Sequence, residues 1–190
     1  HLSVHSFPTR RSSDLAPKWS SSQMTINDQD FDIYTFPGAS YDAEPGEPQL
    51  PYETVHFAVP PGARVSVQLV SQSSEQLQNV KLAPYADMQP FEVEQPTYQV
   101  KSEIYESNAQ MPQQPFVLHE PKTFRSYRIV RLDINPLAFQ PAQSVVTKYD
   151  RLQLRITFQD GQVPARLIPQ PVDEKIKGLV VNYDEEKNWR

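Results

Sequence analysis

Few residues of this 190-residue chain could carry out chemistry, and none of them forms a complete catalytic set. After the first fifteen residues the only histidines are His56 and His119, and the sequence contains no cysteine. The lack of cysteine excludes a disulfide, a thiolate metal site and a thiol nucleophile within this chain. A metal site would need more His, Asp or Glu at ligand spacing than either histidine has beside it. We therefore expect no metal, no cofactor and no enzymatic activity in the chain itself.

Two pairs of carboxylates have the residue types of a glycosidase, which holds two carboxyl groups across a cleft. They are Glu44 with Glu47, and Glu92 with Glu94. Both pairs lie in polar stretches, and we interpret them as solvated loop residues. A phosphate-binding loop is not expected either, because the five glycines are scattered along the chain.

Two basic residues, Lys122 and Arg125, flank Phe124 directly after a proline-rich stretch. One interpretation is ordinary surface charge, since most Lys and Arg side chains are exposed and many have no specific role. The other interpretation is a charged plug that enters an acidic specificity pocket of a partner. The residues alone leave both interpretations open.

The composition excludes several classes of protein. A net charge of −5 disfavours a nucleic-acid platform, which needs a basic face. No run of about 18 apolar residues is present, so no membrane-spanning helix is expected. Nineteen prolines make up about twice the usual ~5%. Because proline interrupts helices, this number favours short extended segments joined by rigid turns.

Alternating apolar residues predict short strands through most of the chain. The clearest pattern spans residues 123–158. Its first strand carries bulk on both faces, as in the middle of a sandwich, and its second has Leu152, Leu154, Ile156 and Phe158 on one face. Further strands are expected at 31–36, 55–59, 65–69, 75–82 and 97–105, an exposed loop at 106–115 and a crossover at 135–141. The segments 55–59 and 65–69 either pair as a hairpin or continue around a corner.

The period changes near the C-terminus. Ile176, Leu179, Val180 and Tyr183 are spaced as one face of a helix. An acidic residue, Asp173, lies in the first turn, where the helix dipole favours negative charge. We therefore expect an all-β fold of about seven to ten antiparallel strands in two packed sheets, with a short C-terminal helix.

Three segments together resemble the N-terminal propeptide of the gingipain-type cysteine peptidases. The first is GEPQLPYETVHFAVPPGARVSV at 46–67, and the second is FRSYRIVRLDINPLAFQPAQSVVTKYDRLQLRITF at 124–158. The third, VVNYDEEKNWR at 180–190, is similar to the N-Y-x-x-A-x-x-W that joins such a propeptide to its catalytic domain, with Glu186 in place of a small residue. The resemblance extends over residues 16–190, with matching order and spacing.

This resemblance implies a jelly-roll-like β-sandwich that assists the folding of the peptidase and covers its active site until cleavage. The implied partner is the cognate gingipain-like catalytic domain, in cis, which carries a His–Cys pair and cuts after Arg or Lys. Such precursors are exported by Bacteroidetes-type bacteria, often by the type IX route, and reach the cell surface or the medium through the periplasm. Lys122 and Arg125 become candidate inhibitory residues, and Arg190 becomes a candidate processing residue.

Three regions are expected along the chain. Residues 5–15, HSFPTRRSSDL, resemble the in-frame translation of a common sequencing adapter. We therefore interpret residues 1–15 as a disordered artefact that replaces the true signal peptide; the alternative is a processing site at Arg10 and Arg11. Residues 16–171 are expected to form the sandwich, and 172–190 a helical junction that leads to a missing catalytic domain.

A carbohydrate-binding or adhesin-type β-sandwich module of a cell-surface protein is the alternative function. Trp19, Tyr34, Tyr41 and Tyr98 could form a sugar platform, although such aromatics are more often half-buried strand residues. A peptidase domain with a His–Cys pair directly after Arg190 would decide between the two functions.

Overall fold

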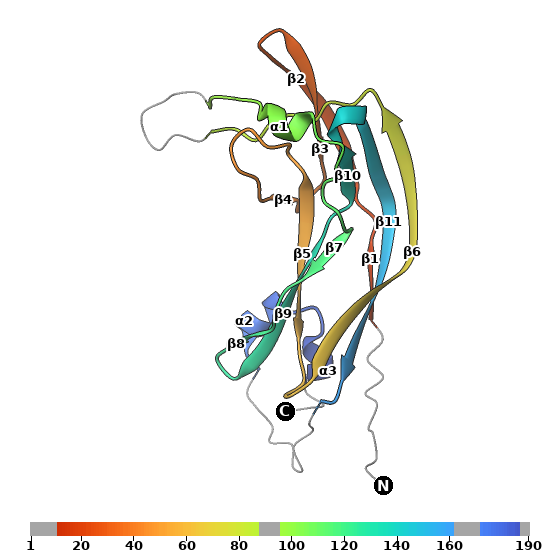
Figure 1. Cartoon of the computed structure of the whole chain (residues 1–190). Coiled ribbons are helices and arrows are strands. Elements are labelled where there is room, and N and C mark those ends of the chain that lie inside the picture. The colour runs from red at the N-terminus through yellow and green to blue at the C-terminus, as the bar shows by residue number, and fades with distance from the viewer. Residues whose placement is uncertain (1–10, 88–95, 162–171, 187–190) are drawn as a thin grey trace.

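The computed structural model describes residues 11–87, 96–161 and 172–186, which form an elongated arrangement of antiparallel strands with a few short helices (Figure 1). In chain order the elements are β1 (Arg11–Leu15), β2 (Ser20–Ile26), β3 (Gln29–Thr35), β4 (Ser40–Tyr41), β5 (Pro51–Ala58), β6 (Arg64–Gln78), α1 (Ser102–Tyr105), β7 (Phe116–Leu118), β8 (Lys122–Phe124), β9 (Tyr127–Ile134), β10 (Leu137–Gln140), the 3-10 helix η1 (Pro141–Gln143), β11 (Val145–Gln159), α2 (Glu174–Leu179) and α3 (Tyr183–Glu186). This architecture confirms the all-β fold class.

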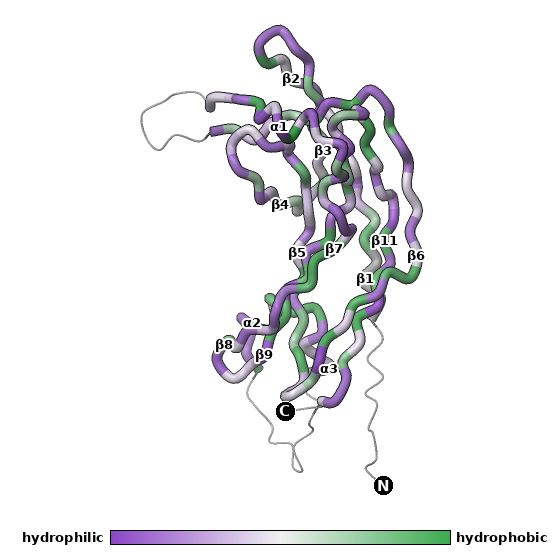
Figure 2. The backbone as a smooth tube through the Cα atoms, viewed as in Figure 1, coloured by the Kyte–Doolittle hydropathy of each residue, from purple (hydrophilic) through white to green (hydrophobic). Residues whose placement is uncertain are grey.

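The first sheet is built around β11, which pairs with β6 along its whole length and with β1 and β10 on its other side. The apolar residues Leu152, Leu154, Ile156 and Phe158 are all buried, and they alternate along β11 as the sequence predicted. The outer edge of β6 has no strand beside it among the described residues. Figure 2 shows hydrophilic residues along most of the upper half of β6.

The second sheet is built around β9, which pairs with β5 on one side and with β7 and β8 on the other. The inward face of β9 carries Val130, Leu132 and Ile134, which pack against β11 in the main core. The outward face carries Tyr127 and Ile129, which are also buried. The prediction of a central strand with bulk on both faces is therefore confirmed.

The chain passes from the second sheet to the first between β5 and β6. β5 pairs with β9, whereas β6 pairs with β11, so the two strands do not form a hairpin. The turn contains Pro60 and Pro61, followed by Gly62 with φ of 72°, a left-handed conformation that glycine adopts without steric cost. Of the two expected connections between these segments, the chain therefore forms the corner and not the hairpin.

A second core lies at the end of the molecule that carries the β2–β3 hairpin (Figure 1). There the buried rings of Phe31 and Phe139 both meet Tyr105 edge to face, with ring centroids 6.4 and 6.3 Å apart. The Tyr105 hydroxyl donates to the carbonyl of Leu82 at 2.8 Å. This hydrogen bond and the two ring contacts hold α1 against the sandwich.

Several segments differ from the sequence-based expectation because distant contacts decide their conformation. Residues 11–15, expected to be disordered, form β1 on β11, while residues 1–10 lie outside the described residues. The segment 97–105, predicted as a strand, ends in α1. The segment 135–141, predicted as a crossover, contains β10, whose Leu137, Ala138 and Phe139 are buried.

The loop at 106–115 contains no helix or strand, as expected, but Met111 exchanges two backbone hydrogen bonds with Phe139 and ties the loop to β10. The predicted C-terminal helix is divided into α2 and α3, and Leu179 is 40% exposed instead of facing the core. None of the helices in the described ranges has the length and apolar character needed to cross a membrane.

The main core can be tested at Leu132, which is fully buried between the two sheets. We expect Leu132→Ala to lower the free energy of unfolding by about 2–5 kcal/mol, because it leaves a cavity where the leucine was packed. Urea denaturation measures this loss. The control is Val117→Ala on the neighbouring β7, where the side chain is 44% exposed and the expected change is within about 0.5 kcal/mol. Equal losses in both variants would contradict this placement of the core.

Candidate functional site

The candidate inhibitory residues belong to a tight hairpin formed by β8 and β9. Phe124 pairs with Tyr127, so the connecting loop has only two residues, Arg125 and Ser126. The φ of Arg125 is 56°, a left-handed conformation that arginine rarely adopts and that two-residue hairpin loops require. Arg125 therefore lies at the tip of the hairpin, at the same end of the molecule as α2 and α3 (Figure 1).

The Arg125 side chain is engaged by two groups of its own chain. Its Nη1 atom donates to Oδ2 of Asp173 at 2.6 Å, in an ion pair that is 51% exposed on the arginine side and 18% on the aspartate side. Its guanidinium carbon lies 5.6 Å from the centroid of the Phe124 ring, within cation–π range. The hairpin tip is therefore tied to the start of the C-terminal segment, residues 172–186, which contains α2 and α3.

Asp173 also forms the N-cap of α2. Its Oδ1 atom accepts from the backbone N–H groups of Lys175 and Ile176, at 3.1 and 3.3 Å. Burial by itself raises the pKa of the Asp173 carboxyl, but the hydrogen bonds from Arg125 and from the helix backbone outweigh it and place the pKa below its usual range. The two carboxylate oxygens thus have separate roles, one for the helix and one for the arginine.

Lys122, the other candidate, lies on β8 opposite Ile129 and is exposed. None of the described residues forms a hydrogen bond or ion pair with its side chain. The structure therefore places Lys122 and Arg125 in the same hairpin but in different settings. Arg190, the candidate processing residue, lies outside the described residues.

The C-terminal segment is anchored to the sandwich by a residue that the sequence analysis missed, Asn182. It is 1% exposed; its Oδ1 accepts from the N–H of Ala58 at 2.8 Å, and its Nδ2 donates to the carbonyl of Ala58 at 2.9 Å. The neighbouring N–H of Val181 donates to the carbonyl of His56 at 3.0 Å. These bonds cover the edge of β5 beyond its short pairing with β4, as a further strand would. The only sequence signal for Asn182 was its place in the junction motif.

Apolar packing holds the same segment on the outward face of β9. The buried set consists of Ala58, Tyr127, Ile129, Ile176, Val180 and Tyr183. In addition, the backbone N–H of Asp173 donates to the Tyr183 hydroxyl at 3.0 Å, which joins α2 to α3. The segment before residue 187 is thus an integral part of the folded domain.

The two histidines lie on the outward side of the second sheet, in structural settings. His119 Nε2 is 2.6 Å from Oδ2 of the buried Asp133. The other carboxylate oxygen, Oδ1, accepts from Thr54 Oγ1 and Arg131 Nε, each at 2.7 Å. Burial, and next the charge of Arg131, lower the pKa of His56. Within residues 11–87, 96–161 and 172–186, no group of three or more His, Asp or Glu is arranged to hold a metal ion.

The carboxylates and aromatic residues considered in the sequence as glycosidase or sugar-binding groups also have structural roles where they are described. Glu44 and Glu47 both pair with Lys101, with Nζ–O distances of 2.9 and 3.4 Å, while Glu92 and Glu94 lie outside the described residues. The aromatic side chains proposed as a sugar platform are half-buried. The Trp19 indole N–H donates to the carbonyl of Tyr149 at 3.2 Å, and its ring meets Phe36 edge to face. They therefore do not form an exposed row of rings.

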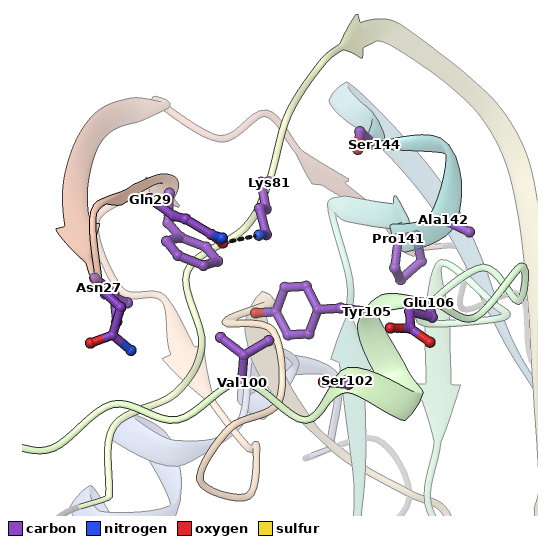
Figure 3. A pocket seen from close by; sticks show the side chains of 12 residues that line it. Asn27, Gln29, Lys81, Val100, Ser102, Tyr105, Glu106, Pro141, Ala142 and Ser144 are labelled. Carbon is purple, nitrogen blue, oxygen red and sulfur yellow. Dashed lines mark hydrogen bonds between the residues drawn. The ribbon is translucent and has the colours of Figure 1, made fainter.

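A cavity of about 700 Å³ is lined by residues of the β2–β3 hairpin and of α1 (Figure 3), which lie at the opposite end of the molecule from the β8–β9 hairpin (Figure 1). Lys81 lies beside it, with Nζ 4.6 Å from the centroid of the Phe31 ring and 2.7 Å from Gln29 Oε1. Tyr105 and Glu106 of the α1 region form its other side. None of the residues singled out in the sequence as catalytic, inhibitory or sugar-binding lines it.

Comparisons with known proteins identify one family. The Propeptide_C25 family model matches residues 17–189. The complex of Porphyromonas gingivalis RgpB pro- and mature domains contains a similar chain, with a TM-score of 0.77 and 18% identity, covering 94% of this chain and 99% of that one. A structure on the zymogenic latency of gingipain K from Porphyromonas gingivalis gives a TM-score of 0.61 and 20% identity, covering 80% and 94%. At these identities the likeness shows a shared fold. No curated protein sequence matches this chain.

The hydrogen bonds to the Asp133 carboxylate predict how the stability of the folded protein changes at acid pH. Burial raises the pKa of Asp133, but the hydrogen bonds from Arg131, Thr54 and His119 lower it more, so the carboxyl is more acidic than usual. Its contribution to stability is complete above the unfolded value of about 3.9 and is lost as the pH falls through the lower folded value. We expect Asp133→Asn to cost about 1–3 kcal/mol at pH 7 and to flatten the decline of stability below about pH 4.

Urea denaturation at a series of pH values measures both effects. The matched control is Asp150→Asn, which removes an exposed carboxylate and should leave the acid-induced decline as in the unchanged protein. A decline that is the same in Asp133→Asn and in the unchanged protein would show that this cluster does not govern acid stability.

Proposed function

Because this chain belongs to the Propeptide_C25 family, the propeptides of gingipain-type cysteine peptidases, we propose that it keeps such a peptidase latent and assists its folding until it is cleaved off. The observation that carries the proposal is the match of the family model over residues 17–189. In this proposal the activity belongs to a catalytic domain in cis, because such a peptidase needs a cysteine and this chain contains none. The precursor is exported, to the cell surface or the medium.

We propose that the peptidase docks at the end of the molecule that carries the β8–β9 hairpin and the C-terminal segment. Seven large apolar side chains among the described residues are at least 38% exposed, and four of them lie in these two elements. They are Phe124, Val172, Leu179 and Val181. The last described element, α3, also lies at this end (Figure 1). A catalytic domain that continues the chain from this end would lie near the hairpin.

At this surface the hairpin supplies a cation for the acidic pocket of a peptidase that cuts after Arg or Lys. Arg125 is the stronger of the two candidates because it lies at the tip and its guanidinium can form two parallel hydrogen bonds to a carboxylate. The tight loop is already ordered, so little conformational entropy is lost on docking. A left-handed turn residue also lacks the extended backbone that strand-type peptide recognition uses, which favours inhibition over cleavage.

The hairpin candidates are tested by adding the purified propeptide to its cognate peptidase and measuring inhibition with a fluorogenic arginyl or lysyl substrate. We expect Arg125→Ala to weaken inhibition by about 30-fold or more, because a charge partner in a desolvated pocket is lost. Lys122→Ala should have a smaller effect. The control Arg155→Ala removes the same charge from an exposed position on β11 and should not change inhibition. Unchanged inhibition in both hairpin variants would eliminate the hairpin as the plug.

Arg190 is proposed as the processing residue, since it ends the junction motif and has the side chain that such a peptidase cuts after. N-terminal sequencing of the mature enzyme should begin directly after Arg190, and Arg190→Gln in the precursor should slow its release. A mature enzyme that starts at another position would refute this assignment.

A further inference from the structure

The guanidinium of Arg125 contacts two groups of the propeptide itself. Asp173 Oδ2 binds its Nη1 atom from the C-terminal segment at 2.6 Å, and the centroid of the Phe124 ring lies 5.6 Å from the guanidinium carbon. Arg125 cannot enter an acidic pocket of a partner while its charge is directed to Asp173. The free propeptide and the proposed docked propeptide therefore require different partners for the same side chain.

We propose that Asp173 is a positioning residue that holds Arg125 on the propeptide surface and competes for it with the acidic pocket of the peptidase. This inference rests on the inhibitory function proposed above. It means that inhibition is weaker than Arg125 alone would give, because the ion pair must be broken before the arginine can enter the pocket. Asp173 thus lowers the strength with which the propeptide binds.

The two carboxylate oxygens of Asp173 bind different groups, so Arg125 can move from Asp173 to the pocket of the peptidase without unfolding α2. Oδ1 accepts from the N–H groups of Lys175 and Ile176 and caps α2. Oδ2 binds Arg125. When Arg125 leaves, the cap remains and α2 stays in place. Because Arg125 is half-exposed in this pair, the attraction is partly screened by water, and the exchange changes affinity by a small factor.

The ion pair also links the hairpin to the junction. Asp173 is bonded through its own N–H to the hydroxyl of Tyr183, which is buried against the sandwich beside the Asn182 anchor. The carboxylate is therefore fixed relative to β5 and β9, and Arg125 has a defined position before docking. Displacement of the C-terminal segment would move Asp173 and free the arginine.

The test is Asp173→Asn in the whole propeptide, with inhibition of the cognate peptidase measured in trans. Asparagine caps a helix as well as aspartate does, so α2 and the melting temperature should be preserved. The charge that holds Arg125 is lost, and we expect inhibition to become about two- to fivefold tighter, the range for an exposed ion pair. The matched control, Glu174→Gln, removes the same charge from the next residue, whose carboxylate is 3.8 Å from Lys177, and should leave inhibition unchanged.

A double-mutant cycle separates this role from a structural one. In an Arg125→Ala background, Asp173→Asn should change inhibition no further, because the residue it acts through is gone. Tighter inhibition by Asp173→Asn in both backgrounds, or equal inhibition by Asp173→Asn and the unchanged propeptide, would overturn the inference. Failure of the unchanged propeptide to inhibit would instead overturn the proposed function, so the two failures can be told apart.

Discussion

The central constraint on this domain is that β9 must be covered on both faces. Its inward face packs against β11 in the main core, and its outward face carries Tyr127 and Ile129, which cannot stay in water without loss of stability. The C-terminal segment meets this requirement, and Asn182 holds it there by completing the edge of β5. The segment is for this reason close enough to the β8–β9 hairpin for Asp173 to reach Arg125. The candidate site is therefore a product of core packing.

Much of the sandwich could be predicted from the sequence because the deciding pattern is local. The alternation along β11 and the double-faced bulk of β9 both depend only on which side of a strand each residue takes. The sequence-based predictions failed where contacts between residues far apart in the chain determine the local conformation. β10 depends on its pairing with β11 and on the two backbone hydrogen bonds that Phe139 exchanges with Met111, and α1 is fixed by the contact of Tyr105 with Phe31 and Phe139. Met111 is distant in sequence from β10, and Phe31 and Phe139 are distant from α1.

The same limit applies to the site. Residue type and position predicted Lys122 and Arg125 as a pair, and the structure separates them into an exposed lysine and an arginine bound by its own domain. Asp173 was recognised only as a residue of the first helical turn, because its partner lies 48 positions away in the chain. Asn182 was marked only by its place in the junction motif, because its hydrogen bonds go to a strand 124 positions earlier in the chain.

The long pairing of β6 with β11 has a consequence for the order of events in biosynthesis. Arg64 pairs with Gln159 and Gln78 with Val145, so the first sheet closes only after a large part of the chain has emerged. Folds dominated by such non-local pairing form slowly, in milliseconds to seconds, because a large loop must close before the contacts are gained. The sandwich is thus completed late, when its last strand appears. In a precursor, a finished template would become available shortly before the sequence that follows it begins to fold.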